Sequence, residues 1–243
     1  MIKKVEGIII KEIPYKETSK ILTIFTKEEG IIGVIAKGCK RIKSPLNAVS
    51  NKLTYGIFHL NYKKELSTLI EVDVLNTFIS IRKDITKISY VSFLTDLATQ
   101  VYKHENNNDI YNLYINSLIK INEGFDYLVI SNILELKLLD FLGIRPVIDK
   151  CTICGNTNNI ATISSYKGGY LCSKCLNNDF IYDKKTISLI RMFYYVDIAK
   201  INKIKIDAKI KKEINQFIDD YYDRYAGLYL KSKEFLKNLE KIS

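Results

Sequence analysis

Short apolar runs, separated by turn-forming or charged residues, fill the first 75 positions of the chain. Runs rich in β-branched residues and bounded by Gly, Pro, Glu or Lys are typical of strands. Five strands in about 75 residues favour a small closed barrel, of which the OB-fold is the common five-stranded form, with an SH3-like barrel as the alternative. The five runs are residues 7–11, 21–26, 31–36, 53–60 and 67–74.

The pattern changes at about Asp84, where apolar residues begin to recur every three or four positions and so predict helices. Asn108-Asp109 can cap a second helix, Asp126 opens a third, and Gly143 ends that one. We expect the later helices to pack back on the earlier ones. The predicted helices cover residues 85–101, 110–121, 126–143, 186–199, 208–225 and 232–239.

Four of the five cysteines form two C-x₂-C pairs, Cys151 with Cys154 and Cys172 with Cys175. Zn²⁺ takes four tetrahedral ligands, and two residues between cysteines let one tight turn aim both sulfurs at one ion. Four protein ligands leave no open coordination position, so we expect one structural Zn²⁺. Direct DNA contact by this module, a redox-sensitive switch and an iron–sulfur cluster are the alternatives. The fifth, Cys39, is expected to be a small buried or loop residue.

Together these segments predict an α+β protein in three parts. The N-terminal five-stranded OB-fold barrel covers residues 1–78, and a helical domain covers residues 79–150 and 180–243. The zinc-binding module, residues 151–179, is inserted in the helical domain, with a short hairpin over residues 160–170 between its cysteine pairs.

The composition suggests a soluble protein with an affinity for polyanions. The net charge is +10 and the pI about 9.2, and nucleic acid is the commonest polyanion of a cytoplasm. The chain is also rich in Lys, Ile and Asn, and the alternative is that part of the lysine excess reflects the base composition of an AT-rich genome. No uncharged apolar run reaches about 18 residues, and the N-terminus has no apolar stretch typical of a signal peptide. We therefore expect a cytoplasmic protein that does not enter membranes.

A basic segment follows the third predicted strand, where a barrel loop is expected. It places four positive charges within seven residues, on Lys37, Lys40, Arg41 and Lys43. Such a loop can bind phosphates with release of counterions, and the hydroxyl of Ser44 can add a contact. The alternative is a merely solvated loop. A second basic run, residues 200–212, contains interspersed acidic residues and reads as solvated surface.

Three aromatic residues near this loop could offer bases a stacking surface, Tyr15, Tyr55 and Phe58. The alternative is that the rings fill the barrel core, which we favour for Phe58. Tyr15 follows Pro14 in a loop-like stretch, which favours exposure.

No pattern of catalytic residues stands out. The two histidines, His59 and His104, have no obvious carboxylate partner, and the carboxylates form no evident metal-binding nuclease cluster. The glycines at 33 and 38 precede Cys39-Lys40 rather than Lys-Ser or Lys-Thr, so they do not form a P-loop. A binding protein is favoured over an enzyme, although an unusual active site stays open.

Several segments, taken in order, resemble the RecO family of bacterial recombination mediators. The resemblance runs over nearly the whole chain, with Cys39 as a minor departure where a small residue such as Ala is expected. It rests on Gly7, residues 15–19, 22–26, Gly30, residues 36–44, the four cysteines with Gly155 and Gly168-Gly169, and the ending at residues 225–236.

The resemblance implies an OB-fold, a helical domain and a zinc module, in a protein that acts without catalysis. It also implies binding to single- and double-stranded DNA, annealing of complementary strands, and work at the nucleoid during repair. The implied partners are RecR and the acidic C-terminal tail of single-strand-binding protein (SSB), with RecA served indirectly by its loading onto SSB-coated DNA. The competing hypotheses are a zinc-ribbon assembly factor that binds proteins and a metal-dependent nuclease.

Overall fold

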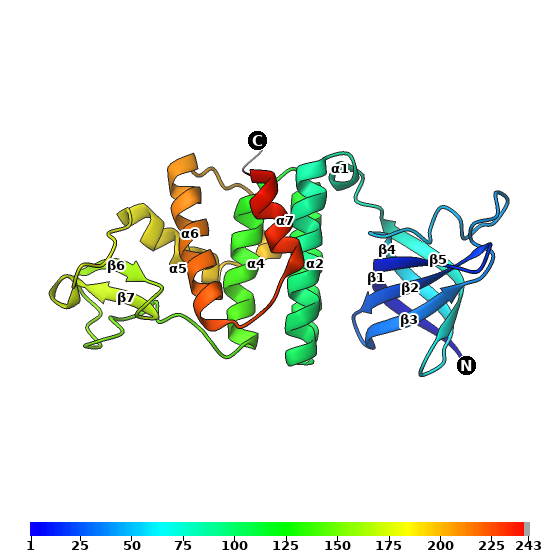
Figure 1. Ribbon diagram of the computed structural model, residues 1–243, viewed down its shortest axis with the longest axis horizontal. Coiled ribbons are helices and arrows are strands. Elements are labelled where there is room, and N and C mark those ends of the chain that lie inside the picture. Colours follow the sequence, from blue (N-terminus) through cyan, green and yellow to red (C-terminus); the bar gives the residue numbers. More distant parts are fainter. Residues whose placement is uncertain (241–243) are drawn as a thin grey trace.

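The computed structural model of the chain describes residues 1–240, with side chains described through residue 236. The molecule is elongated, with a β-barrel at one end, helices in the middle and a two-stranded hairpin unit at the other end (Figure 1). The predicted α+β class, with an N-terminal five-stranded sheet, a helical body and clustered cysteines, is confirmed. No helix within the described residues has the length and apolar character needed to cross a membrane.

The barrel closes in the strand order β1-β2-β3-β5-β4, with β4 paired back to β1. The first strand is longer than predicted, because its first half pairs with β4 and its second half with β2. A register shift between Ile9 and Lys11 bends it between these two neighbours. The strands are β1 (Ile2–Tyr15), β2 (Ser19–Thr26), β3 (Gly30–Ala36), β4 (Tyr55–Asn61) and β5 (Ser67–Asn76).

Alternate residues of the strands fill the barrel, and they include Leu22, Ile24, Val34 and Phe58. Phe58 is fully buried, as favoured from the sequence. Cys39 is also buried in this core, together with Leu46 from the loop between β3 and β4. Part of that loop therefore packs into the barrel core.

The helices begin near their predicted starts because polar side chains cap them. The carboxylates of Asp84 and Asp126 accept hydrogen bonds from the first backbone N–H groups of α2 and α4. Asn107, one residue before the predicted cap, does the same for α3. The helices are α1 (Ile79–Arg82), α2 (Ile85–His104), α3 (Asn108–Asn122), α4 (Tyr127–Phe141), α5 (Lys184–Tyr195), α6 (Ala208–Tyr225) and α7 (Lys231–Glu240).

One predicted helix, residues 186–199, is wrong at its C-terminal end. α5 stops at Tyr195 because Val196 and Asp197 are extended, and Asp197 then caps a separate 3₁₀ turn over Ile198–Lys200. The sequence reading also missed α1, a single turn between the barrel and α2.

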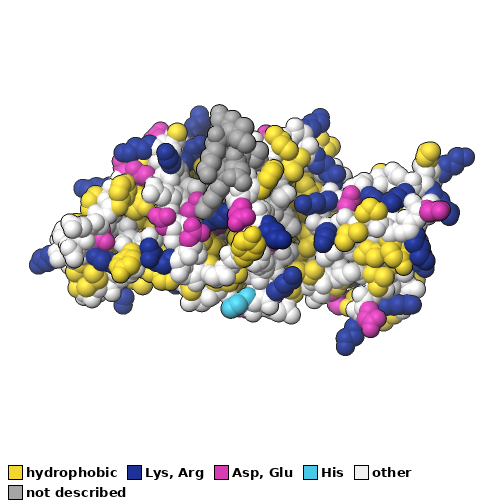
Figure 2. All heavy atoms as spheres, viewed as in Figure 1, with side chains coloured by type: hydrophobic (Ala, Val, Ile, Leu, Met, Phe, Trp, Pro, Cys, Tyr) yellow, Lys and Arg dark blue, Asp and Glu magenta, His cyan; other side chains and the backbone are white. Residues whose placement is uncertain are grey.

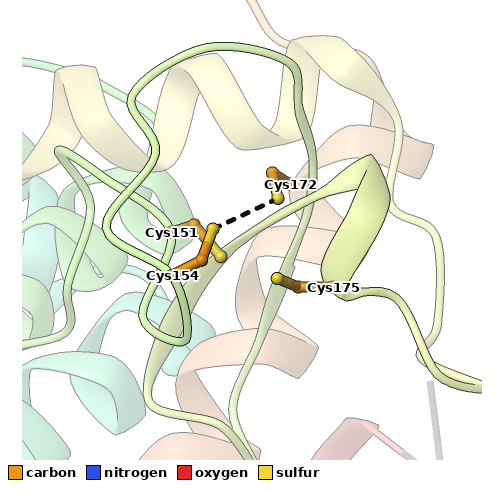
Figure 3. A group of neighbouring side chains, drawn as sticks. All are labelled: Cys151, Cys154, Cys172 and Cys175. Carbon is orange, nitrogen blue, oxygen red and sulfur yellow. Dashed lines mark hydrogen bonds between the residues drawn. The ribbon is translucent and has the colours of Figure 1, made fainter.

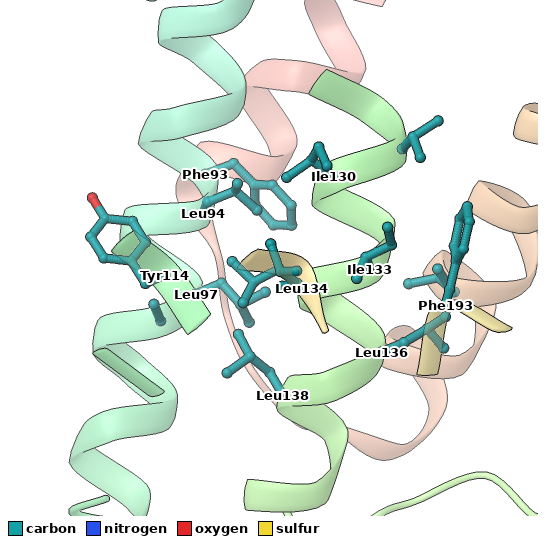
Figure 4. Packing of buried hydrophobic residues seen from close by; sticks show 14 of the residues in the cluster. Phe93, Leu94, Leu97, Tyr114, Ile130, Ile133, Leu134, Leu136, Leu138 and Phe193 are labelled. Atoms are coloured by element: carbon teal, nitrogen blue, oxygen red, sulfur yellow. The ribbon is translucent and has the colours of Figure 1, made fainter. Parts of the chain in front are cut away.

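Helix α4 forms the centre of the helical body. Leu134 of α4 lies against Leu97 of α2, whereas Leu136 points toward Phe193 of α5 (Figure 4). Burial on nearly every side explains why this helix is so rich in leucine. The helices that follow the hairpin unit thus pack on those that precede it, as expected.

The barrel and the helices share one hydrophobic core. Phe25, on β2, points out of the barrel among three tyrosines of the helices. Its ring centroid lies 4.9 Å from that of Tyr102, 5.2 Å from that of Tyr111 and 6.1 Å from that of Tyr114. This contact fixes where the barrel's outer loops lie.

Candidate metal centre and nucleic-acid interface

The two C-x₂-C pairs converge at the hairpin unit. All four sulfurs lie within 4.8 Å of one another, and the Sγ atoms of Cys154 and Cys172 are 3.6 Å apart (Figure 3). Sulfurs about 2.3 Å from a tetrahedral Zn²⁺ would stand about 3.8 Å from each other. The four cysteines therefore fit a single metal ion of this size.

Local backbone geometry builds each half of the cluster. After the first pair, Gly155 takes a left-handed conformation (φ +73°), and its N–H donates to the carbonyl of Cys151 over 2.9 Å. The second pair follows the hairpin of β6 (Ile160–Ser164) and β7 (Gly169–Cys172). Gly169 is required there, because a side-chain carbon would lie 2.2 Å from the carbonyl oxygen of Val147.

The sulfurs differ in their acidity. Burial opposes ionisation of Cys151, but backbone N–H groups of Cys154, Cys172 and Ile153 outweigh it and lower the pKa of this thiol to about 6. Hydrogen bonds to the sulfurs of Cys154 and Cys172 raise the pKa of the Cys175 thiol to about 12. Four thiolates this close repel one another, so the cluster suits a dication that displaces the remaining protons.

The basic segment forms an ordered loop at the outer end of the barrel. The N–H of Lys40 donates to the carbonyl of Thr18 over 2.9 Å, and the N–H of Gly38 donates to the hydroxyl of Ser19 over 3.2 Å. These bonds hold the loop against the turn between β1 and β2. The side chain of Cys39, which is buried in the barrel core, anchors the loop to the barrel. The backbone is fixed while the charged side chains point away from the core.

All four cations of this loop, Lys37, Lys40, Arg41 and Lys43, are exposed. Within the described residues, no carboxylate lies within 4.0 Å of any of them. In Figure 2, Lys and Arg side chains outnumber Asp and Glu side chains around the outer edge of the barrel. The structure thus places four unneutralised cations together.

The other predicted contact residues lie at the same end. Tyr15 pairs with Ser19 in the β1–β2 hairpin and is 38% exposed. The ammonium of Lys16, a residue that the sequence reading left out, lies 5.5 Å from the centre of the Tyr15 ring. Ser44 is half-buried, and its hydroxyl accepts a hydrogen bond from the N–H of Leu46, which helps to shape the loop.

Two expectations about other residues need correction or qualification. His59 does have a carboxylate partner, since its Nε2 lies 2.7 Å from Oδ2 of Asp73 across the β4–β5 pair. Tyr55 is half-buried on the helical side of the barrel, where its hydroxyl donates to Glu6. The Tyr55 ring is therefore not available as a free surface on which bases could stack.

Three of the six lysines in the second basic run, residues 200–212, have an acidic partner. Lys200, Lys209 and Lys211 each form an ion pair, with Asp197, Glu213 and Asp126 respectively. This surface has mixed charge, as expected from the sequence.

Comparisons with known proteins agree over the whole chain. The family model "Recombination protein O N terminal" matches residues 1–78, and "Recombination protein O C terminal" matches residues 82–234. The chain is 35% identical to the DNA repair protein RecO of Halalkalibacterium halodurans over 246 residues, covering 100% of this chain and 97% of the relative. It is 37% identical to the DNA repair protein RecO of Bacillus cereus (strain AH187) over 247 residues, covering 99% of each.

These matches extend from the barrel with its basic loop through the four-cysteine cluster to the last helices. The chain therefore belongs to the recombination protein O (RecO) family.

Proposed function

We propose that this protein is a non-enzymatic DNA-binding factor of recombinational repair. It binds single- and double-stranded DNA and anneals complementary strands. Together with RecR it helps to load RecA onto DNA coated by SSB. The observation that carries the proposal is the anchored loop whose four cations have no acidic partner within the described residues. Its chemistry is that of phosphate binding, because Lys and Arg side chains on a fixed backbone replace the counterions of a nucleic acid.

The proposed contact residues are Lys37, Lys40, Arg41 and Lys43, with Ser44 and Tyr15 beside them. Lysine and arginine bind phosphates without regard to sequence, and an exposed tyrosine gives bases a face to stack on. This combination predicts strong salt dependence and little sequence preference. No bond of the DNA needs to be broken for such a role.

The four-cysteine cluster is proposed to hold one structural Zn²⁺, on Cys151, Cys154, Cys172 and Cys175. With all four positions taken by sulfur, the ion has no place for water or substrate. Bound zinc would supply folding free energy to a hairpin unit that has little hydrophobic core of its own. We place the unit's limits at residues 151–179, between a barrel at residues 1–78 and a helical domain at residues 79–150 and 180–243.

The partners proposed are RecR and the acidic C-terminal tail of SSB, with RecA as the indirect beneficiary. The place of action is the cytoplasm, at the nucleoid during repair. The support for these partners is family membership together with the basic surface. A strand-annealing assay with and without SSB and RecR measures them.

Fluorescence anisotropy of labelled DNA at two salt concentrations tests the central proposal. We expect binding at low salt that weakens steeply as salt rises. Absence of binding at low salt would overturn it. Recovery of proteins but no DNA in a pull-down would favour the zinc-ribbon assembly factor, and cleavage of the labelled DNA with divalent metals would favour the nuclease.

A further inference from the structure

Helix α7 lies against α2 and places the ammonium group of Lys233 between α2, α4 and α6 (Figure 1). Nζ of Lys233 lies 2.6 Å from Oδ1 of Asp219 on α6 and 3.7 Å from Oε1 of Glu135 on α4. It lies 5.7 Å from the centre of the Phe93 ring on α2 and 5.2 Å from that of the Tyr222 ring on α6. Carboxylates and aromatic faces both attract an ammonium group. The four side chains that form this lysine socket are those of Phe93, Glu135, Asp219 and Tyr222.

Hydrogen bonds within the helical body position the socket. The hydroxyl of Tyr222 donates to the backbone carbonyl of Glu135 over 2.8 Å, and Nδ2 of Asn215 donates to Oδ2 of Asp219 over 3.2 Å. Within the part of the chain that the structure describes, Lys233 is the only cation within 4.0 Å of Glu135 or Asp219. The socket therefore needs a cation in it, because a buried charge that loses its partner is costly.

Leucines on both sides of Lys233 complete the face that α7 turns toward the helical body. Leu230 comes directly before the helix and Leu236 follows Lys233 by three residues, and both leucines are buried. Residues three apart lie on one side of a helix, whereas Lys231 and Phe235 are exposed. The docked segment thus presents one pattern, which is an apolar residue, a lysine and an apolar residue at intervals of three.

Few bonds fix the start of α7. Residues 227–230, which join it to α6, have no regular secondary structure. The hydroxyl of Ser232 donates to Oδ2 of Asp96 over 2.8 Å, and Nε2 of Gln100 donates to the carbonyl of Tyr229 over 3.1 Å. This connection can act as a hinge on which α7 leaves the helical body.

Packing around the lysine is incomplete. A cavity of about 30 Å³ borders Lys233 on the side of Leu236, and a cleft of about 180 Å³ borders it on the side of the hinge. A buried ion pair adds little net stability, because each charge loses its hydration, whereas an occupant without the matching charge is penalised heavily. The socket therefore discriminates between occupants more than it stabilises α7.

Charge decides which occupant fits this groove. Four carboxylates face it from three helices, those of Asp96, Glu135, Asp219 and Asp223. They repel an acidic peptide or a nucleic acid, and a wholly apolar helix would leave Glu135 and Asp219 without a cation. A helix that carries a lysine between two apolar residues satisfies both the socket and its apolar flanks.

We infer that the groove between α2, α4 and α6 is a docking site for a lysine-bearing amphipathic helix of a partner protein, and that α7 occupies this site in the free protein. A tethered helix acts at an effective concentration of about millimolar, so α7 closes the site to weak competitors. A partner helix docks when it binds more tightly than α7 does. This site takes a protein helix and not DNA, so it goes beyond the proposed DNA-binding function.

Opening the site in the full-length chain tests the inference. The probe is a fluorescein-labelled peptide with the sequence of residues 226–243, and its binding is followed by anisotropy. Lys233→Ala leaves the docked state without the socket's cation, so α7 should leave and the peptide should bind at least about tenfold more tightly than to the unaltered protein. Lys231→Ala, at an exposed position of the same helix, is the matched control and should bind like the unaltered protein. Leu236→Ala loosens α7 with the socket intact and serves as a second open variant if Lys233→Ala folds poorly.

A designed peptide tests the chemistry of the occupant apart from its sequence. It is an alanine-based helix with leucine, lysine and leucine at the spacing of Leu230, Lys233 and Leu236, and it is otherwise unrelated to this chain. We expect its affinity for the open variant to lie within about tenfold of that of the natural peptide, because a few anchor residues carry most of the binding energy. Replacing its lysine by alanine should weaken binding at least about tenfold, as expected for the loss of a bond to a charged group.

Three results would overturn the inference. If neither open variant bound the natural peptide, the groove would not be a docking site. If the lysine-to-alanine peptide bound as well as its parent, the socket would not select lysine. If the natural peptide bound and the designed peptide did not, the groove would serve only the chain's own helix.

Discussion

The barrel and the remainder of the chain carry the same excess of positive charge but present it differently. Residues 1–78 contain 13 Lys and Arg against eight Asp and Glu, and residues 79–243 contain 24 against 19, an excess of five in each part. In the hairpin unit and the helices around it, several basic residues form ion pairs with carboxylates. For example, Nζ of Lys167 lies 2.7 Å from Oδ2 of Asp179, and Nη2 of Arg191 lies 3.2 Å from Oδ1 of Asp149.

The loop after β3 has no such neutralisation within the described residues. Its cations lie on a backbone that is bonded to the β1–β2 turn, so they stay together without carboxylates to hold them. A count of lysines is therefore a poor guide to a polyanion site. What matters is whether the fold supplies acidic partners, because a phosphate must compete with any carboxylate already in place.

Removal of the metal should produce the largest effect and should spare the barrel. Chelation, or Cys154→Ala, is expected to unfold residues 151–175, because structural zinc can contribute on the order of 10 kcal/mol to folding. Metal analysis should find one zinc per chain before treatment, and hydrogen exchange should then rise in this segment alone. Cys39→Ala is the matched control, since Cys39 is buried in the barrel core, and it should keep the zinc.

The DNA affinity of the zinc-free protein should also be measured. If the two ends differ as proposed, the zinc-free protein keeps its affinity for DNA, measured by anisotropy. A fall in affinity that parallels zinc loss would show that the hairpin unit contacts DNA as well as the barrel.

Replacing the loop cations should have the next largest effect. The quadruple variant of Lys37, Lys40, Arg41 and Lys43 to Ala should lose on the order of a hundredfold in DNA affinity at physiological salt, and the slope of log affinity against log salt should flatten by about three to four. Titration by anisotropy at several salt concentrations measures both quantities.

The matched control removes as many positive charges from paired positions, by changing Lys167, Lys185, Arg191 and Lys209 to Ala. Each of these has an acidic partner within 4.0 Å. We expect its DNA affinity to fall by less than about threefold, since only the long-range field changes. Equal losses in both variants would mean that net charge alone governs binding.

A third environment for a lysine is burial beside a buried carboxyl group. It gives a smaller effect, which is a pH dependence of the free energy of unfolding. Lys233 of α7 lies 2.6 Å from Asp219 and 3.7 Å from Glu135, which is buried in α4. Burial raises the pKa of Glu135 to about 7 from an ordinary value of 4.5, against the opposing attraction of Lys233. The folded protein therefore binds more protons than the unfolded chain between these two values, and this carboxyl lowers stability as pH rises through that window.

Glu135→Gln removes this titration. Its unfolding free energy relative to that of the unaltered protein should improve as pH rises from about 5 to about 8, by roughly one or two kcal/mol. Urea unfolding at several pH values measures the difference. A difference that is flat with pH would show that Glu135 titrates alike in the folded and unfolded states.

Local signals account for what the sequence could predict. Asp126 caps α4 through bonds to its own next residues, and the C-x₂-C spacing builds a metal turn within a few positions. Long-range pairings were missed, because no local pattern records them. The bond from Lys40 to Thr18 and the contact of His59 with Asp73 each join residues well apart in the sequence. Unpaired charge is likewise a property of the fold, since the sequence shows where lysines are and not which carboxylates reach them.

The smallest expected effect comes from removing the carboxylate that neutralises two arginines near the hairpin unit. The carboxylate of Asp149 accepts from Arg145 over 3.3 Å and from Arg191 over 3.2 Å, and the hydroxyl of Tyr195 also donates to it. Asp149→Asn keeps the shape but frees two guanidinium groups. Exposed ion pairs of this kind contribute only about 0.2–1 kcal/mol, so DNA affinity at low salt should rise about two- to threefold and return to normal at high salt.

Asp149→Asn tests whether pairing is what separates the two ends. A gain that appears only at low salt would show that guanidinium groups released from a carboxylate become available to phosphates. An unchanged affinity would show that free charge is insufficient away from the barrel. The advantage of the loop after β3 would then lie in how its backbone bonds to the β1–β2 turn hold four cations together.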